Sequence, residues 1–182
     1  MLQRTILAVV LLSVFAAVSA QQNLDLPMVK RDTRVFERIV SEVLTQNFSS
    51  PFAITAEPRG AYLQGYGLSV SFQLNINRGR IRTPFGEMKT SAALKQRTKD
   101  QQIKLVRETM TQCLADYGHS VKQLGPHDRI TIQAHIEDRN ELDPAKSTTV
   151  LVMSVLKDDI NLLATRKISP ETFRERVHVL MY

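Results

Sequence analysis

The sequence predicts an α+β domain in which helices pack on one face of an antiparallel sheet. Segments with apolar residues at helical spacing alternate along the chain with pairs of segments in which every second residue is apolar. The two strands of each pair follow one another without a helix between them, which favours antiparallel pairing over a parallel sheet with crossover helices. The expected order is α-β-β-α-β-β-α, followed by a final strand or an ordered tail.

The strand pattern is clearest at 68–75 and 129–137, where apolar and polar side chains alternate as in a strand with one buried face. Gly65 and Gly67 stand just before the first of these strands and indicate a β-bulge or a close approach of another backbone. The expected helices are 34–47, 99–117, 160–165 and a short helix from Pro170, and the expected strands are 52–55, 68–75, 129–137, 148–156 and 177–182.

The first twenty residues have the pattern of a secretory signal peptide. Arg4 precedes an uncharged, mainly apolar stretch from Ile6 to Ala20, and small residues at its end fit cleavage after Ala20. As a helix this stretch would be about 22 Å long, which is less than the roughly 30 Å hydrocarbon core of a membrane. We therefore expect an exported protein, periplasmic or secreted, with no transmembrane segment after signal cleavage.

Behind the signal peptide we expect an N-terminal arm at 21–31 and a single α+β domain at 32–182. About 150 residues suit one hydrophobic core. The only cysteine, Cys113, lies on the apolar face of the expected helix at 99–117 and is interpreted as a buried thiol. A single cysteine excludes an intramolecular disulfide framework and any CxxC zinc or redox site.

Within the domain, 78–98 is expected to be a long basic loop. It contains Gly79, Pro84 and Gly86, and Glu87 is its one acidic residue. Arginine side chains bind phosphate and carboxylate groups through paired hydrogen bonds, so this loop is the candidate site for an anionic partner. The alternative is a solvated loop whose charge aids solubility. The candidate anion-binding residues are Arg78, Arg80, Arg82, Lys89 and Arg97.

The sequence contains no recognisable catalytic or metal-binding motif. The glycines around Tyr66 lack the third glycine and the following helix of a dinucleotide-binding loop, and there is no GxSxG motif or closely spaced histidine pair. We therefore predict no cofactor and no metal site. An enzyme would need a site assembled from residues distant in sequence, for which the candidates are His119, His127, His135 and Glu137.

The 24 basic and 18 acidic residues give a net charge of +6, which favours anionic partners. Together these observations predict an exported, non-enzymatic binding or interaction domain of the cell envelope or extracellular space. Its expected partner is an anionic envelope component (phospholipid, lipopolysaccharide or acidic glycan) or a protein, and no nucleic acid is expected. Two alternatives stay open: an enzyme with an assembled site, and a subunit of an envelope assembly that uses edge strands or an exposed helix face.

Overall fold

The structure, a computed structural model, describes residues 25–48, 52–76, 80–83, 86–89, 98–138 and 147–182. The predicted signal peptide lies outside these residues, as do Arg78 and Arg97 of the expected basic loop. None of the helices within the described ranges combines the length and apolar character needed to cross a membrane.

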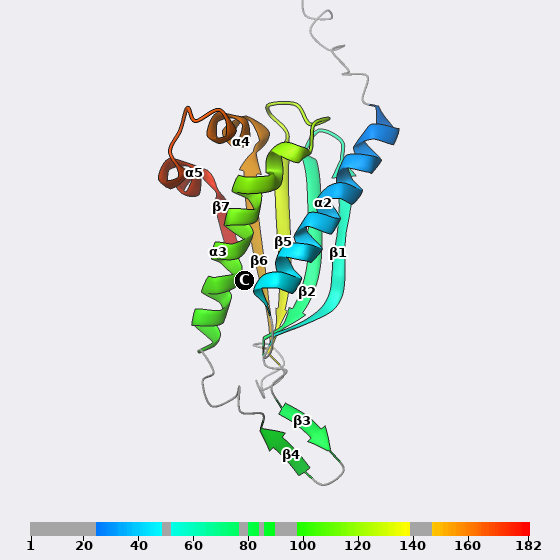
Figure 1. Ribbon diagram of the computed structural model, residues 1–182, viewed down its shortest axis with the longest axis vertical. Helices are drawn as coiled ribbons and strands as arrows, with labels where there is room; N and C mark the ends of the chain where they lie inside the picture. The colour runs from blue at the N-terminus through cyan, green and yellow to red at the C-terminus, as the bar shows by residue number, and fades with distance from the viewer. Residues whose placement is uncertain (1–24, 49–51, 77–79, 84–85, 90–97, 139–146) are drawn as a thin grey trace, which may run out of the picture.

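The described residues form two layers, a five-stranded sheet and a layer of helices on one of its faces (Figure 1). This arrangement confirms the predicted α+β class. The strands of the sheet, in spatial order, are β1 (Ala53–Leu63), β2 (Gly67–Asn75), β5 (Arg129–Glu137), β6 (Thr148–Leu156) and β7 (His178–Met181). The helices are α2 (Leu26–Asn47), α3 (Lys99–Tyr117), α4 (Lys157–Ala164) and α5 (Pro170–Arg176), with a 3₁₀ turn η3 (Gly118–Ser120) after α3.

The sheet is mixed, which corrects the prediction of an antiparallel sheet. β2 and β5 run parallel from the pair Gly67–Arg129 to the pair Asn75–Glu137, whereas the other neighbouring strands are antiparallel. The cause is α3, which lies between β2 and β5 in the sequence and carries the chain back to the end of the sheet where β2 begins. The prediction considered only consecutive strands, and β2 and β5 are not consecutive.

The hydrophobic core lies between the two long helices and the sheet. Each helix buries a stripe of residues four positions apart, because that spacing returns to the same helix face. The stripes are Phe36, Val40 and Leu44 on α2 and Val106, Met110 and Leu114 on α3, and they cover Leu68, Val70, Phe72, Leu74, Ile130, Ile132, Ala134, Ile136, Leu151, Met153 and Val155 of the sheet.

Four parts of the chain differ from the expectation, and one of them is α4, which begins at Lys157 instead of residue 160. α2 begins at Leu26, within the expected N-terminal arm, because the Asp25 carboxylate accepts the Met28 N–H (3.1 Å) and Pro27 occupies the first turn. β1 continues to Leu63 instead of ending near residue 55. The expected basic loop contains a separate antiparallel hairpin of β3 (Arg80–Thr83) and β4 (Gly86–Lys89).

The two edges of the sheet are built differently. β1 has two register shifts against β2, one between Ile54 and Ala56 and one between Ala56 and Arg59, and it contains Pro58, which has no N–H to donate. β7 pairs with β6 in an uninterrupted register. Bulges, proline and charged residues are the features that discourage an edge from pairing with another strand, and β1 has all three.

Gly67 occupies the closest approach between two strands of the sheet. Its φ is +125°, a conformation that side chains rarely adopt, and a Cβ added here would lie 2.1 Å from the carbonyl oxygen of Arg129. The backbone approach that the sequence predicted is therefore the start of the β2–β5 pairing, where Gly67 is the register partner of Arg129.

We expect Gly67→Ala to destabilise the protein by at least about 3 kcal/mol, because backbone strain and a clash with a central strand act together. The matched control is Gly65→Ala, where φ is +76° but no heavy atom lies within 4 Å of the new methyl group. Strain alone should cost this control about 1–2 kcal/mol. Urea unfolding followed by circular dichroism measures both values, and equal losses would contradict the clash at β5.

Candidate functional site

The described part of the basic segment is the β3–β4 hairpin, which Figure 1 shows beyond the lower end of the main sheet. Its register pairs Arg80 with Lys89 and Arg82 with Glu87. Directly paired residues share a face of an antiparallel hairpin, so three of the five predicted anion-binding residues have positions on one face. The other two, Arg78 and Arg97, lie outside the described residues.

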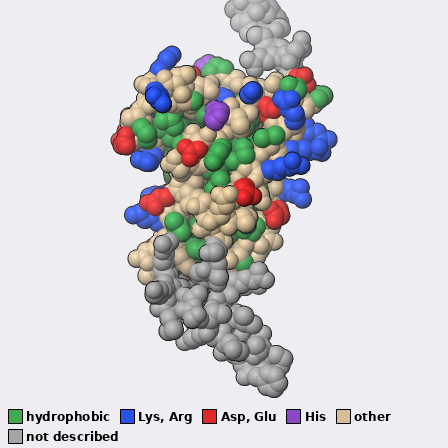
Figure 2. Space-filling view, viewed as in Figure 1, with side chains coloured by type: hydrophobic (Ala, Val, Ile, Leu, Met, Phe, Trp, Pro, Cys, Tyr) green, Lys and Arg blue, Asp and Glu red, His purple; other side chains and the backbone are tan. Residues whose placement is uncertain are grey.

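A second basic surface, which the sequence analysis missed, follows α2. Lys30, Arg34 and Arg38 are exposed and stand four residues apart, so they form one stripe about 12 Å long on the outer side of the helix. In Figure 2 basic side chains gather over this helix. None of the three side chains has an ion pair or a hydrogen bond to the part of the chain that the structure describes. Their charges are therefore available to a ligand.

Two shallow grooves adjoin this stripe. The first, about 390 Å³, is lined by no acidic residue among the described ones; its described lining is Pro27, Lys30, Arg31, Arg34, Val35 and Arg38. The second, about 360 Å³, lies between α2 and β1 and adds Arg59 to Arg34 and Arg38. We call Lys30, Arg34, Arg38 and Arg59 together the α2 basic surface.

The carboxylates in the second groove are already engaged. Glu37 Oε1 accepts the Gly60 N–H at 2.6 Å, and Glu57 Oε2 accepts the Ser41 hydroxyl at 2.8 Å. Both bonds connect α2 to β1 and do not involve the arginines. The acidic groups of this groove therefore hold the helix on the strand while the guanidinium groups keep their hydrogen-bond donors.

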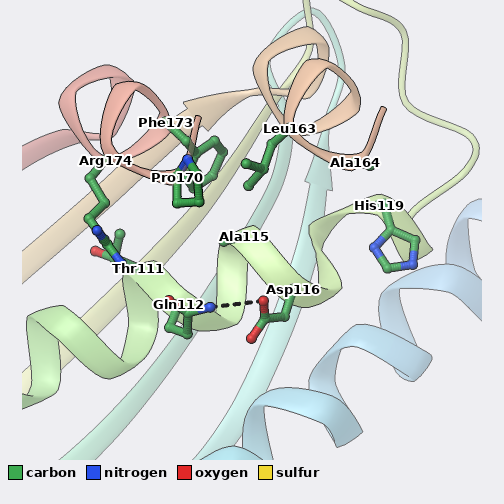
Figure 3. A pocket seen from close by; sticks show the side chains of 10 residues that line it. All are labelled: Thr111, Gln112, Ala115, Asp116, His119, Leu163, Ala164, Pro170, Phe173 and Arg174. Carbon is green, nitrogen blue, oxygen red and sulfur yellow. Dashed lines mark hydrogen bonds between the residues drawn. The ribbon is translucent and has the colours of Figure 1, made fainter. Parts of the chain in front are cut away.

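A groove of about 510 Å³ lies between α3 and the pair α4–α5 (Figure 3). Leu163, Pro170 and Phe173 form its apolar part, and His119 lies at one end. Asp116 in its lining accepts a hydrogen bond from Gln112 of the same helix (2.9 Å). The groove contains no nucleophile paired with a base, so its geometry suits contact with an apolar group better than catalysis.

The structure separates the four residues proposed for an assembled catalytic site. His119 is on η3 in the helix layer, whereas His135 and Glu137 lie on β5 on the opposite face of the sheet from the buried isoleucines. His127 lies in the turn before β5, whereas His135 lies roughly 20 Å along β5 from the first residue of that strand. Among the described residues no three His, Cys, Asp or Glu side chains are grouped so that they could hold a metal ion.

Glu137 belongs to a polar row on the open face of the sheet. Its carboxylate accepts a hydrogen bond from the Gln73 amide on the neighbouring strand, and Gln133 donates to the Ser69 hydroxyl (2.9 Å) in the same way. These cross-strand bonds join β2 to β5. They give Ser69, Gln73, Gln133 and Glu137 a structural role in the sheet.

Cys113 is buried on α3 as the helical pattern predicted. Burial, with a smaller contribution from the negative charge of Asp116, raises the pKa of its thiol from 9.0 to about 12. A thiol with such a pKa is a poor nucleophile at neutral pH.

A buried lysine fixes the loop after α3. Lys157 Nζ donates to the Gly118 carbonyl at 3.0 Å, and its backbone N–H donates to the Asp128 carbonyl at 2.8 Å. Burial lowers the pKa of Lys157 from 10.5 to about 8, and the nearby charge of Asp32 opposes this shift. Asp32, also buried, accepts the Lys122 N–H at 2.9 Å and so ties the same loop to α2.

No family model matches the chain, and neither a curated protein nor a solved structure is significantly similar to it.

The free energy of unfolding should show a contribution from Lys157 that rises between pH 8 and pH 10.5. In this window the folded lysine has lost its proton while the unfolded lysine still holds one, so the unfolded state binds more protons and stability increases with pH. Cys113 acts in the opposite direction above pH 9, because its pKa is raised on folding.

The comparison of the wild type with Lys157→Met removes the Cys113 contribution, which both proteins share. We expect the wild type to gain stability relative to Lys157→Met as the pH rises through this window, measured by urea unfolding at each pH. The control is Lys122→Met, which replaces an exposed lysine in the loop after α3. Its stability should change with pH in parallel with that of the wild type. A parallel curve for Lys157→Met would show that the lysine is not desolvated in the folded protein.

Proposed function

We propose that this protein is an exported, non-enzymatic binding domain that contacts an anionic component of the cell envelope through the α2 basic surface. The observation that carries the proposal is a stripe of three exposed cationic side chains that pair with none of the described residues, beside a groove to which those residues contribute no carboxylate. Export rests on the signal-peptide pattern of residues 1–20. The ligand classes are the phosphate groups of phospholipid or lipopolysaccharide and the carboxylate or sulfate groups of an acidic glycan.

The chemistry of the stripe suits a ligand with repeated negative charges. Neighbouring side chains four residues apart are about 6 Å apart at Cβ, so Lys30, Arg34 and Arg38 can each meet a different anionic group along a 12 Å path. An exposed ion pair contributes at most about 1 kcal/mol, so affinity must come from several contacts at once. Such binding weakens as salt rises, because exposed charges are screened.

The β3–β4 hairpin supports the same function as a second contact. Arg80, Arg82 and Lys89 have positions on one of its faces. Figure 1 shows the hairpin at the opposite end of the molecule from the start of α2, so a single small anion cannot touch both regions. A membrane surface or a long polyanion can, which favours extended ligands over small ones.

The test compares three variants for retention on phosphatidylglycerol vesicles, lipopolysaccharide and an acidic polysaccharide. Lys30→Gln/Arg34→Gln/Arg38→Gln should lower retention about tenfold or more at low salt, because three contacts are lost together. Arg80→Gln/Arg82→Gln should give a smaller loss. The ligand on which the first variant loses most identifies the source of the anionic groups.

The matched control removes the same number of exposed positive charges elsewhere, as Lys122→Gln/Arg166→Gln/Lys167→Gln. If binding depends on the α2 basic surface and not on net charge, this control should retain binding within about twofold of the wild type. All variants should melt at nearly the wild-type temperature. Equal losses in the control and the α2 variant would mean that binding follows net charge and not this surface.

A further inference from the structure

The edge strand β7 exposes a continuous apolar row. The exposed fractions are 43% for Val179, 59% for Leu180, 58% for Met181 and 71% for Tyr182. Alternation along the strand directs Val179 and Met181 to the helix side of the sheet and Leu180 and Tyr182 to the open side. Apolar side chains on both faces of one exposed edge are unusual, because such an edge readily pairs with another strand.

Only every second residue of β7 forms backbone hydrogen bonds to β6. Tyr182 both donates its N–H to the Val150 carbonyl (3.1 Å) and accepts the Val150 N–H (2.7 Å), so it faces β6. Because backbone groups alternate along a strand, Leu180 faces β6 as well, whereas Val179 and Met181 direct their N–H and C=O groups away from the sheet. β7 is the last strand of the sheet in the described part of the chain, so these groups have no strand partner there.

We propose that β7 pairs antiparallel with β7 of a second copy of this chain, about a two-fold axis at Leu180. Val179 of each copy then lies opposite Met181 of the other, and both exchange N–H···O=C bonds through the groups that face outward. Leu180 lies opposite Leu180 in a pair without hydrogen bonds, and His178 lies opposite Tyr182. The two five-stranded sheets become one sheet of ten strands.

The strand itself favours a second copy as the occupant. Centring the axis on Leu180 uses both outward-facing residues of each copy and places apolar opposite apolar on the helix side, so the edge is complementary to itself. The adjoining groove of about 650 Å³ contains Arg107, Arg174 and Glu108, so residues of both signs line the edge that would meet its copy. Because both signs are present, the two copies would not bring only positive or only negative side chains together.

The area of the contact lies near the lower limit for a specific dimer. Burial of four apolar side chains on each copy, on the order of 100 Å² apiece, together with the walls of the adjoining groove, approaches the roughly 1,000 Å² that a biological interface needs. Interfaces of this size belong mostly to weak, transient complexes, so we expect self-association in the micromolar range. This inference does not depend on the proposed anion binding.

Sedimentation velocity of the full protein from micromolar to sub-millimolar concentration tests the dimer. The wild type should shift from monomer to dimer over this range, and Leu180→Lys should stay monomeric, because two ammonium groups would meet on the axis. The control is Leu63→Lys, which changes a leucine of similar exposure (47%) on the opposite edge strand and should dimerise like the wild type. A wild type that stays monomeric throughout would overturn the proposal.

A cysteine pair tests the register without relying on destabilisation. Opposite residues in a pair without hydrogen bonds have Cα atoms about 4.5 Å apart, within the range that a disulfide spans. Leu180→Cys should therefore form a disulfide-linked dimer under mild oxidation, while Leu63→Cys should not. The native Cys113 is buried and does not compete. A dimer that persists in Leu180→Lys and gives no Leu180→Cys cross-link would place the interface elsewhere and refute the pairing of β7.

Discussion

The parallel pairing of β2 with β5 is the constraint on which the rest of the structure depends. Each half of the domain supplies one long helix and a pair of antiparallel strands, and only this pairing joins the two halves in one sheet. It requires a glycine at its start, since the backbone of Arg129 occupies the space of a side chain at Gly67. It also brings α2 and α3 onto the same face, where their stripes close a single core.

The sequence predicted those parts of the fold whose signals are local. The strand 129–137 and the helix 99–117 agree with the structure because the spacing of apolar residues is a property of neighbouring residues. The pairing of β2 with β5 was missed because periodicity tells which face of a strand is buried but not which strand lies beside it. β1 was predicted too short because Pro58 and its exposed polar neighbours interrupt the alternation.

The α2 basic surface was also missed in the sequence, because the start of α2 was placed too late. Lys30, Arg34 and Arg38 have helical spacing in the sequence, but residues 21–31 were interpreted as an arm, so the first of them was not placed on a helix. The structure also shows that α2 is held firmly on the domain. The inner face of α2 is buried, and Asp32 and Glu37 attach the helix to the loop at Lys122 and to Gly60 of β1. A charged surface on a fixed helix loses little conformational entropy in binding beyond that of its side chains.

The irregular strand β1 has a consequence for how far the sheet can be extended by further copies of the chain. A protein with two regular edge strands can add copies at both ends without limit, and the product is a fibril. In this chain the two register shifts and Pro58 make one edge a poor template, while β7 is regular. A sheet that extends through β7 would present β1 at both of its outer ends. Assembly would then stop at two chains, because the bulged β1 strands at both ends would not pair with further copies.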